Sequence, residues 1–102
     1  MASRPRLVRL FLGGAAVAAL VAVALWPDAL PVDVASSDSI TAAAAQLGDL
    51  DGMVFLAGVY WPMRAQDWDV KSAEAMADIN FTGCIRAVGA ALPGMVAKGS
   101  GH

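Results

Sequence analysis

The sequence predicts an α/β fold in which strands and helices alternate and the strands form a parallel sheet. Three observations lead to this prediction: an apolar run at 53–58, an amphipathic helical pattern before it at 36–47, and a longer helical pattern after it from about residue 67. Repeated strand and helix units of this length join parallel strands by right-handed crossovers. With a further short strand at 29–34, the expected order is strand, helix, strand, helix, which forms an incomplete sheet.

The composition is that of a protein that can bury a core. Of the 102 residues, 58% are hydrophobic, more than a disordered chain carries. From Leu10 onward, four basic residues stand against nine acidic ones, so we expect no nucleic-acid partner. The single cysteine, Cys84, excludes an internal disulfide, and with one histidine, His102, we expect no metal site.

The N-terminal segment has two interpretations. Residues 10–26 carry no charge, follow three arginines and contain the small-x-small triplet at 22–24, as in a signal peptide or membrane anchor. However, eight of these seventeen residues are Gly or Ala, and the run is short for a membrane span. The alternative is an apolar strand and helix of a buried sheet, a degenerate first half of the fold. We therefore divide the chain into an apolar segment at 1–28 and an α/β domain at 29–102.

The elements of the second part follow in order. The short strand at 29–34 carries Asp33 near its carboxyl end. Ser36 is placed to cap the next helix, whose apolar positions recur at i, i+3, i+4 and i+7 from Ile40, and Gly48 is placed to end it. The run at 53–58 suits a central strand buried on both faces. The second helix is expected from near Asp67 to residue 96, with a kink or an end at Pro93.

Five short motifs in this part resemble the short-chain dehydrogenase/reductase family. Asp33-Val34 is similar to the acidic dipeptide that closes the third strand of that family, and Ala57-Gly58 falls where its Asn-Asn-Ala-Gly closes the fourth. Asn80, with a glycine three residues later, matches the asparagine of the following helix. Residues 92–95 and 99–102 resemble the end of that helix and the turn into the fifth strand. The resemblance implies part of a Rossmann-like, doubly wound parallel sheet.

The resemblance also implies binding roles for four residues. Asp33 would accept a hydrogen bond from the adenine amino group of a nicotinamide cofactor, and the backbone at Val34 would lie along the ring. Ala57 and Gly58 would let the backbone pass close to the cofactor ribose, since larger side chains would fill that space. The alternatives are a loop or helix-capping aspartate and a glycine that only ends a strand.

Asn80 is the candidate catalytic residue. In the family the matching asparagine lies at a distortion of the helix and holds a water of the proton relay that serves the catalytic lysine. An asparagine within an apolar helical pattern is costly unless its amide is satisfied. The alternative is an amide that only joins two backbone groups.

The sequence departs from the family at several points. Phe55-Leu56 replaces the pair of asparagines, and Gly13-Gly14 is the only candidate for the glycine-rich phosphate loop. The serine and the Tyr-x-x-x-Lys pair of the family would follow residue 102. Tyr60 has no lysine four residues later. We therefore expect the 102-residue chain to be a truncated form that is inactive alone.

The resemblance implies an NAD(P)-dependent oxidoreductase that transfers hydride between nicotinamide and a carbonyl or alcohol substrate. It further implies NAD or NADP as cofactor, a small-molecule substrate, a homo-oligomer and a cytoplasmic location. The alternative function is a small membrane-anchored or exported protein without catalytic activity, which associates with the membrane through residues 10–26.

Overall fold

The computed structural model describes residues 7–10 and 30–102. The membrane or targeting interpretation of residues 10–26 and the candidate phosphate loop at Gly13-Gly14 therefore lie almost wholly outside the described residues. The division of the chain at residue 28 also falls among residues that the structure does not describe, and it stays a prediction.

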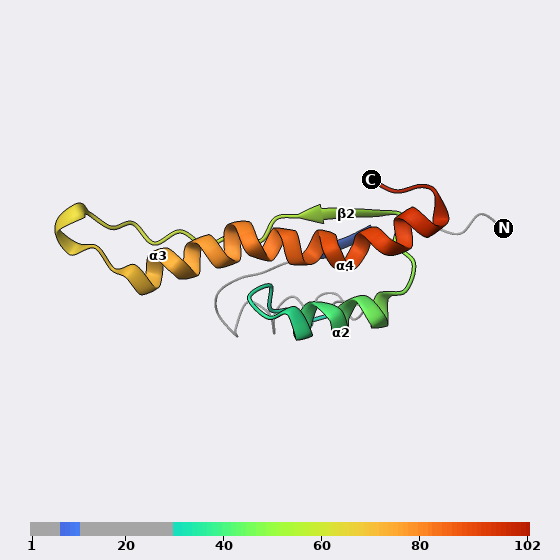
Figure 1. The fold of residues 1–102 in the computed structure, drawn as a ribbon, viewed down its shortest axis with the longest axis horizontal. Helices are drawn as coiled ribbons and strands as arrows, with labels where there is room; N and C mark the ends of the chain where they lie inside the picture. The colour runs from blue at the N-terminus through green and yellow to red at the C-terminus, as the bar shows by residue number, and fades with distance from the viewer. Residues whose placement is uncertain (1–6, 11–29) are drawn as a thin grey trace.

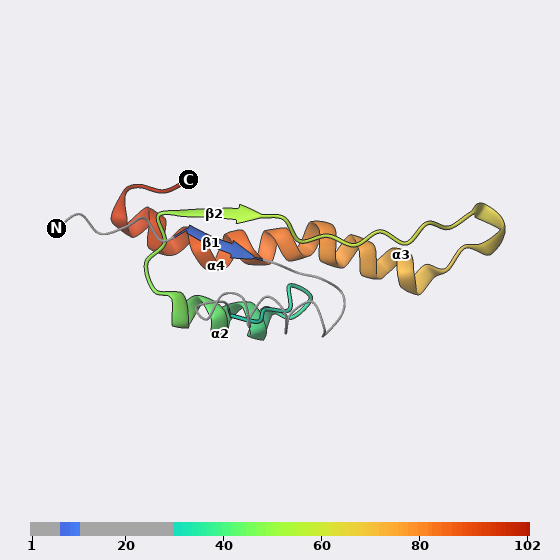
Figure 2. The ribbon, with the colours of Figure 1, turned by 180° about the vertical axis from the view of Figure 1, so that it is seen from behind.

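Two parallel strands and one layer of helices make up the described fold. Strand β1 (Leu7–Leu10) pairs with β2 (Gly52–Phe55), so that Leu7 lies opposite Gly52 and Leu10 opposite Phe55. Helix α2 (Ser37–Leu47) packs against α4 (Gly83–Lys98), and α4 also contacts β2 (Figures 1 and 2). The order strand, helix, strand, helix confirms the α/β prediction.

The first strand is not where we predicted it. Of the predicted strand at 29–34, the described residues 30–34 belong to no strand, and β1 is the partner of β2 instead. Pro31 has no N–H to give to a sheet. The N–H of Asp33 donates to Ser39 Oγ (2.9 Å), and its carbonyl accepts from the N–H of Ser36 (3.1 Å), so a turn uses the groups that a sheet would need.

Helix α2 begins and ends where its sequence predicts. Ser36 Oγ accepts a hydrogen bond from the N–H of Ser39 at 3.2 Å, which satisfies a donor in the first turn. Ile40 and Ala43 are buried. Gly48 ends the helix with a φ of 66°, a conformation that favours glycine.

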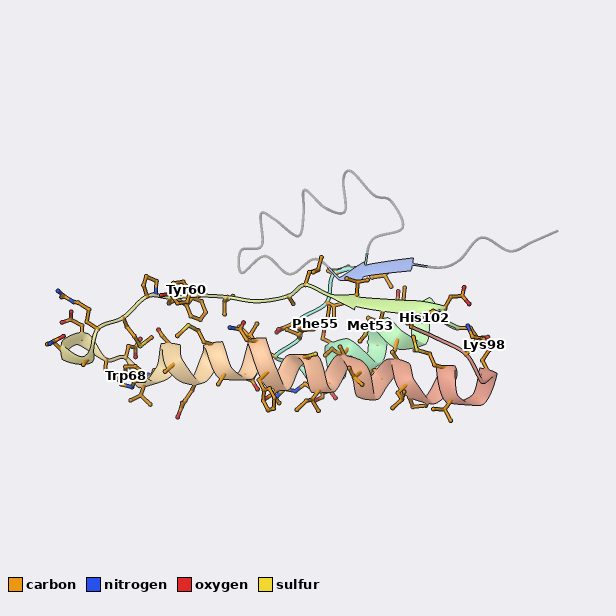
Figure 3. All side chains as sticks on the ribbon, turned by 90° about the horizontal axis from the view of Figure 1, so that it is seen from above. Met53, Phe55, Tyr60, Trp68, Lys98 and His102 are labelled. Atoms are coloured by element: carbon orange, nitrogen blue, oxygen red, sulfur yellow. The ribbon has the colours of Figure 1, made fainter. Side chains whose placement is uncertain are left out.

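The strand β2 has one covered and one open face. Met53 and Phe55 point toward α4 (Figure 3), and Phe55 packs on the core cluster of Val34, Ile40 and Ala57. Val54 points the other way and is 41% exposed. The prediction of a strand buried on both faces is therefore wrong, because helices among the described residues cover only the face of Met53 and Phe55.

A 3-10 turn, η1 (Ala65–Asp67), precedes a continuous helix made of three parts: α3 (Val70–Ala77), a π-helical turn η2 (Asp78–Thr82), and α4. The predicted end or kink at Pro93 does not end the helix, which continues to Lys98. The carbonyl that Pro93 leaves without a helical donor belongs to Gly89, which is exposed, so water can satisfy it.

The long helix ends in a Schellman motif. Gly99 has a φ of 77°, its N–H donates to the carbonyl of Val96 (3.1 Å), and the N–H of Ser100 donates to the carbonyl of Met95 (3.2 Å). Lys98 Nζ then reaches the residues just before β2, where it donates to the carbonyl of Leu50 (2.9 Å) and to Asp51 Oδ1 (2.6 Å). The C-terminal end of α4 is thereby tied to the start of β2.

His102 lies along the edge of β2 that β1 does not occupy. Its N–H donates to the carbonyl of Asp51 (3.2 Å), and its carbonyl accepts from the N–H of Met53 (2.7 Å). These two bonds flank Gly52 in the way that a residue of a parallel strand does. Strand β1, strand β2 and His102 thus follow one another across the sheet (Figure 3).

The continuous helix Val70–Lys98 is also long and apolar enough to cross a membrane when length and composition alone are considered. Core helices of soluble proteins meet the same criterion, so this observation carries little weight by itself. Among its charged residues, Arg86 and Asp78 pair with each other, and Arg86 contacts the segment before α2. Those contacts are typical of a helix that packs against other elements of the same protein.

Asp69 caps α3 and should make its first turn sensitive to acid. The pKa of Asp69 lies below its ordinary value of 3.8, first because Ser72 Oγ donates to Oδ2 (2.6 Å), and also because the N–H of Lys71 donates to Oδ1 (3.1 Å). The folded state thus favours the carboxylate. Its contribution is complete above the unfolded pKa of about 3.9 and is lost as the pH falls through the lower folded value.

We expect the amide signals of Lys71 and Ser72 to titrate with a midpoint below 3.8 in an NMR pH series. Asp69→Asn is the matched control, because asparagine also caps helices but does not titrate. A midpoint at or above the ordinary aspartate value would contradict this assignment.

Candidate functional site

The candidate site lies at the carboxyl end of β2, where the chain leaves the sheet. Ala57 is buried, with 8% of its surface exposed, and joins Val34 in the core cluster. Gly58 is exposed and lies against Asn80: a Cβ at Gly58 would come 3.3 Å from Asn80 Oδ1. Glycine therefore leaves room at this position for the asparagine side chain.

Asn80 lies on the π-helical turn, and its side chain forms hydrogen bonds with the backbone just after Gly58. Its Oδ1 accepts from the N–H of Val59 at 2.8 Å, and its Nδ2 donates to the carbonyl of Val59 at 2.8 Å. Both backbone groups of one residue are thus satisfied by one side chain, a bond pattern that fixes the orientation of the amide. The amide joins two backbone groups, as our alternative interpretation describes. The role in a proton relay remains a prediction.

The π turn places Asn80 where a regular helix would not. Gly83 N–H donates to the carbonyl of Asp78, five residues earlier, so the helix contains one extra residue at this turn. Such turns often occur at functional sites in proteins. The family resemblance implies a helix distortion at Asn80, and the π turn lies there.

Asp33 and Val34 form the second part of the site. Asp33 is exposed, and its Oδ1 accepts from the N–H of Ala35 at 2.9 Å in a local turn. Among the described residues, no hydrogen bond occupies Oδ2 of Asp33. Val34 points inward and is 1% exposed. The turn therefore presents a carboxylate outward while its neighbour anchors it in the core.

Two further residues, Arg86 and Gly83, connect these parts. Arg86 donates from Nη1 to the carbonyl of Val34 (3.0 Å) and from Nη2 to Asp78 Oδ1 (2.7 Å). Its pKa is raised, first by the hydrogen bond to Asp78 and also by the charges of Asp78 and Asp33. Gly83 lies directly against Val34. In the sequence, Gly83 is visible as the glycine three residues after Asn80. The pair of Arg86 and Asp78 is not visible, because the two residues are eight positions apart and not at the three- or four-residue spacing of helical side-chain contacts.

The structure thus groups the predicted residues in two pairs of contacts. Asn80 lies against Gly58, and Val34 shares the core cluster with Ala57. Asp33 stands outside this packing at the exposed side of its turn. The replaced pair Phe55-Leu56 has divided roles, since Phe55 packs on the core and Leu56 is 71% exposed.

Comparison with known proteins identifies the family. The family model described as short chain dehydrogenase matches residues 15–102. The chain belongs to the short-chain dehydrogenase/reductase family. Its α/β fold is therefore the Rossmann-like fold of these oxidoreductases.

Relatives of known sequence and structure agree with this assignment. An uncharacterized oxidoreductase of Staphylococcus haemolyticus is 34% identical over 77 residues, which are 72% of this chain and 33% of that protein. The solved serine dehydrogenase of Escherichia coli matches with a TM-score of 0.63 and 32% identity over 70% of this chain and 35% of that one. A short-chain dehydrogenase of Streptomyces avermitilis matches with a TM-score of 0.68 and 27% identity over 79% of this chain and 32% of that one. The chain thus spans about a third of the length of these relatives.

Proposed function

We propose that this chain contributes the central part of an NAD(P)-dependent oxidoreductase that acts on a small carbonyl or alcohol substrate. The observation that carries the proposal is the clamp between Asn80 and the backbone of Val59, which sets a polar side chain beside Gly58 at the carboxyl end of a parallel strand. In α/β sheets, ligands bind at that end of the strands.

The residues of the site fit an adenine dinucleotide. Asp33 is exposed and has a carboxylate oxygen, Oδ2, that no described bond occupies, which suits it to accept from the adenine amino group. Gly58 exposes its backbone and carries no side chain that would fill the space of a ribose. The bound cofactor would supply the hydride or receive it. The candidate phosphate loop, Gly13-Gly14, lies outside the described residues.

We propose that these 102 residues contain groups that bind the cofactor but not the groups that complete the reaction. Asp33, Val34, Ala57 and Gly58 would bind the cofactor, and Asn80 would hold the water of the proton relay. Tyr60 is followed four residues later by Arg64, so the printed sequence contains no Tyr-x-x-x-Lys pair to move the proton. A polypeptide of these residues should therefore bind without turning over. A cytoplasmic location follows from the same proposal, because nicotinamide cofactors are concentrated there.

Titration of the isotope-labelled polypeptide with NADH and NADPH tests the proposal. We expect NMR shifts confined to the amides of residues 33–35 and 57–59, and no change of cofactor absorbance in the presence of carbonyl or alcohol substrates. Asp33→Ala should weaken binding about tenfold, the effect of one hydrogen bond to a charged group.

Asp38→Ala is the matched control, because Asp38 is also exposed and lies in the first turn of α2, away from the turn at 33–35. Equal losses in the two variants would show that only the overall charge matters. Shifts absent from both segments would contradict cofactor binding, and turnover by the isolated polypeptide would contradict the expected inactivity.

We further infer that the chain associates with copies of itself, as members of the family commonly do. The support is an apolar stripe on the outer face of η2 and α4, which no other described element covers. It consists of Phe81, Ile85, Val88, Leu92 and Val96, which are between 40% and 70% exposed. Their spacing of three or four residues places them on one side of the helix.

A further inference from the structure

The turn that carries Asp33 is attached to the rest of the protein in an unusual way. Its backbone groups are mostly satisfied locally: the N–H of Asp33 by Ser39, the N–H of Ala35 by Asp33, and the carbonyl of Asp33 by Ser36. The carbonyl of Val34 is the exception. It accepts from Arg86, 52 positions away, in a partly buried contact.

Arg86 is itself held by the π turn. Its Nη2 donates to Asp78, the first residue of that turn, and its side chain is 22% exposed. A guanidinium has a rigid fork of donors, so one nitrogen cannot move from Asp78 without moving the other from Val34. Asp78, Arg86 and the Val34 carbonyl therefore form one bridge between the helix and the turn.

The same helical turn presses on the same residue. A Cβ at Gly83 would lie 2.9 Å from Val34 Cγ2 and 3.2 Å from the Val34 carbonyl oxygen. The helix backbone thus lies against Val34, and Arg86 holds its carbonyl. Val34 has little freedom, and Asp33 directly precedes it.

We propose that Arg86 is a positioning residue for cofactor binding: through the Val34 carbonyl it holds the turn in the conformation in which Asp33 presents its carboxylate to adenine. This inference rests on the proposed function, and it adds that the helix carrying Asn80 controls the adenine side of the site. Arg86 does not touch the cofactor. It acts through the backbone of Val34 and Asp33.

The probe is ADP, which contains the adenine and ribose of the cofactor without nicotinamide. Binding to the 102-residue polypeptide is followed by the NMR shifts of the amides of Asp33, Val34 and Ala35. We expect Arg86→Met to weaken ADP binding about tenfold, because it removes a charge-assisted hydrogen bond that fixes the turn. Hydrogen exchange at Ala35 should accelerate in the same variant.

Arg86→Lys is the conservative variant and keeps the charge with a single, compact donor group. It should bind ADP with an affinity between those of the wild type and the methionine variant. Ala91→Gly weakens α4 through helix propensity without contacting the turn, so it should lower stability and leave ADP affinity unchanged. This control separates positioning from a general loss of structure.

Each outcome has a distinct meaning. If Arg86→Met and Arg86→Lys both bind ADP as the wild type does, the positioning role is overturned while the proposed function stands. If Ala91→Gly weakens ADP binding as much as Arg86→Met does, the effect is one of stability and the positioning role is also overturned. If the wild type shows no shift at Asp33 with ADP, the adenine site itself is wrong, and the proposed function fails together with this inference.

Discussion

Replacing Gly83 with alanine is expected to destabilise the protein by about 1–3 kcal/mol, the cost of forcing an extra carbon into a packed core. The new Cβ would lie 2.9 Å from Val34 Cγ2 and 3.0 Å from Val34 Cβ. Val34 cannot move away easily, because its side chain is 1% exposed and its carbonyl is bonded to Arg86. Urea unfolding measures the change in the free energy of unfolding.

Gly89→Ala is the matched control on the same helix. A Cβ at Gly89 meets nothing within 4 Å, so alanine there should stabilise the helix by about 0.5–1 kcal/mol through its higher helix propensity. The two alanine variants should therefore shift the unfolding midpoint in opposite directions. Equal midpoints would show that α4 does not press on Val34 as the structure describes.

A second large effect is expected from charges placed on the apolar stripe of α4. The stripe lies on the face of η2 and α4 that no other described element covers, and it consists of Phe81, Ile85, Val88, Leu92 and Val96. Exposed apolar patches of this kind commonly mark protein interfaces. A twofold contact between two copies would bring the same residues of both helices together.

Ile85→Glu combined with Leu92→Glu should convert the assembled protein to monomer, because each charge appears twice in a twofold interface and loses its water there. Both side chains are at least half exposed in the isolated chain, so folding should survive. Sedimentation velocity measures the mass. Ala97→Glu, on another exposed part of α4, is the charge-matched control and should leave the assembly intact.

Two results would contradict the self-association. One is a wild-type protein that sediments as a monomer at all concentrations. The other is a wild-type protein that sediments with lipid vesicles and is released from them by the double variant, which would assign the apolar stripe of the helix Val70–Lys98 to a membrane instead.

Local signals in the sequence were sufficient for the elements whose ends depend on local chemistry. Helix α2 begins after Ser36 and ends at Gly48 as predicted, because a side-chain cap and a left-handed φ are properties of a few neighbouring residues. The strand at 53–58 was also found, although β2 is shorter. The family resemblance supplied the position of the helix distortion at Asn80.

The sequence was less informative at three other places. The residues around Pro31 and Asp33 read as a strand, but Ser39 and Ser36 take the groups that a strand would use. Pro93 reads as a helix end, yet the helix continues beyond it to Lys98, because the exposed carbonyl of Gly89 can bond to water instead. Nothing in the local pattern of Arg86 pointed to the carbonyl of Val34, 52 positions away.

The segment from Asp51 to Val59, which contains β2, is tied to the long helix at both ends, by Lys98 at Asp51 and by Asn80 at Val59. Eight residues of extended chain between the strand anchors span about 26 Å, and eighteen residues of helix between the helix anchors span about 27 Å. The distance between the two anchors is therefore nearly the same along the extended chain and along the helix. A single-residue insertion in the strand would lengthen the extended chain between the anchors by about 3.3 Å and turn the side chains that follow it to the opposite face. One in the helix would rotate one anchor by about 100° relative to the other. We therefore expect the segment between the two anchors to tolerate substitutions better than changes in length.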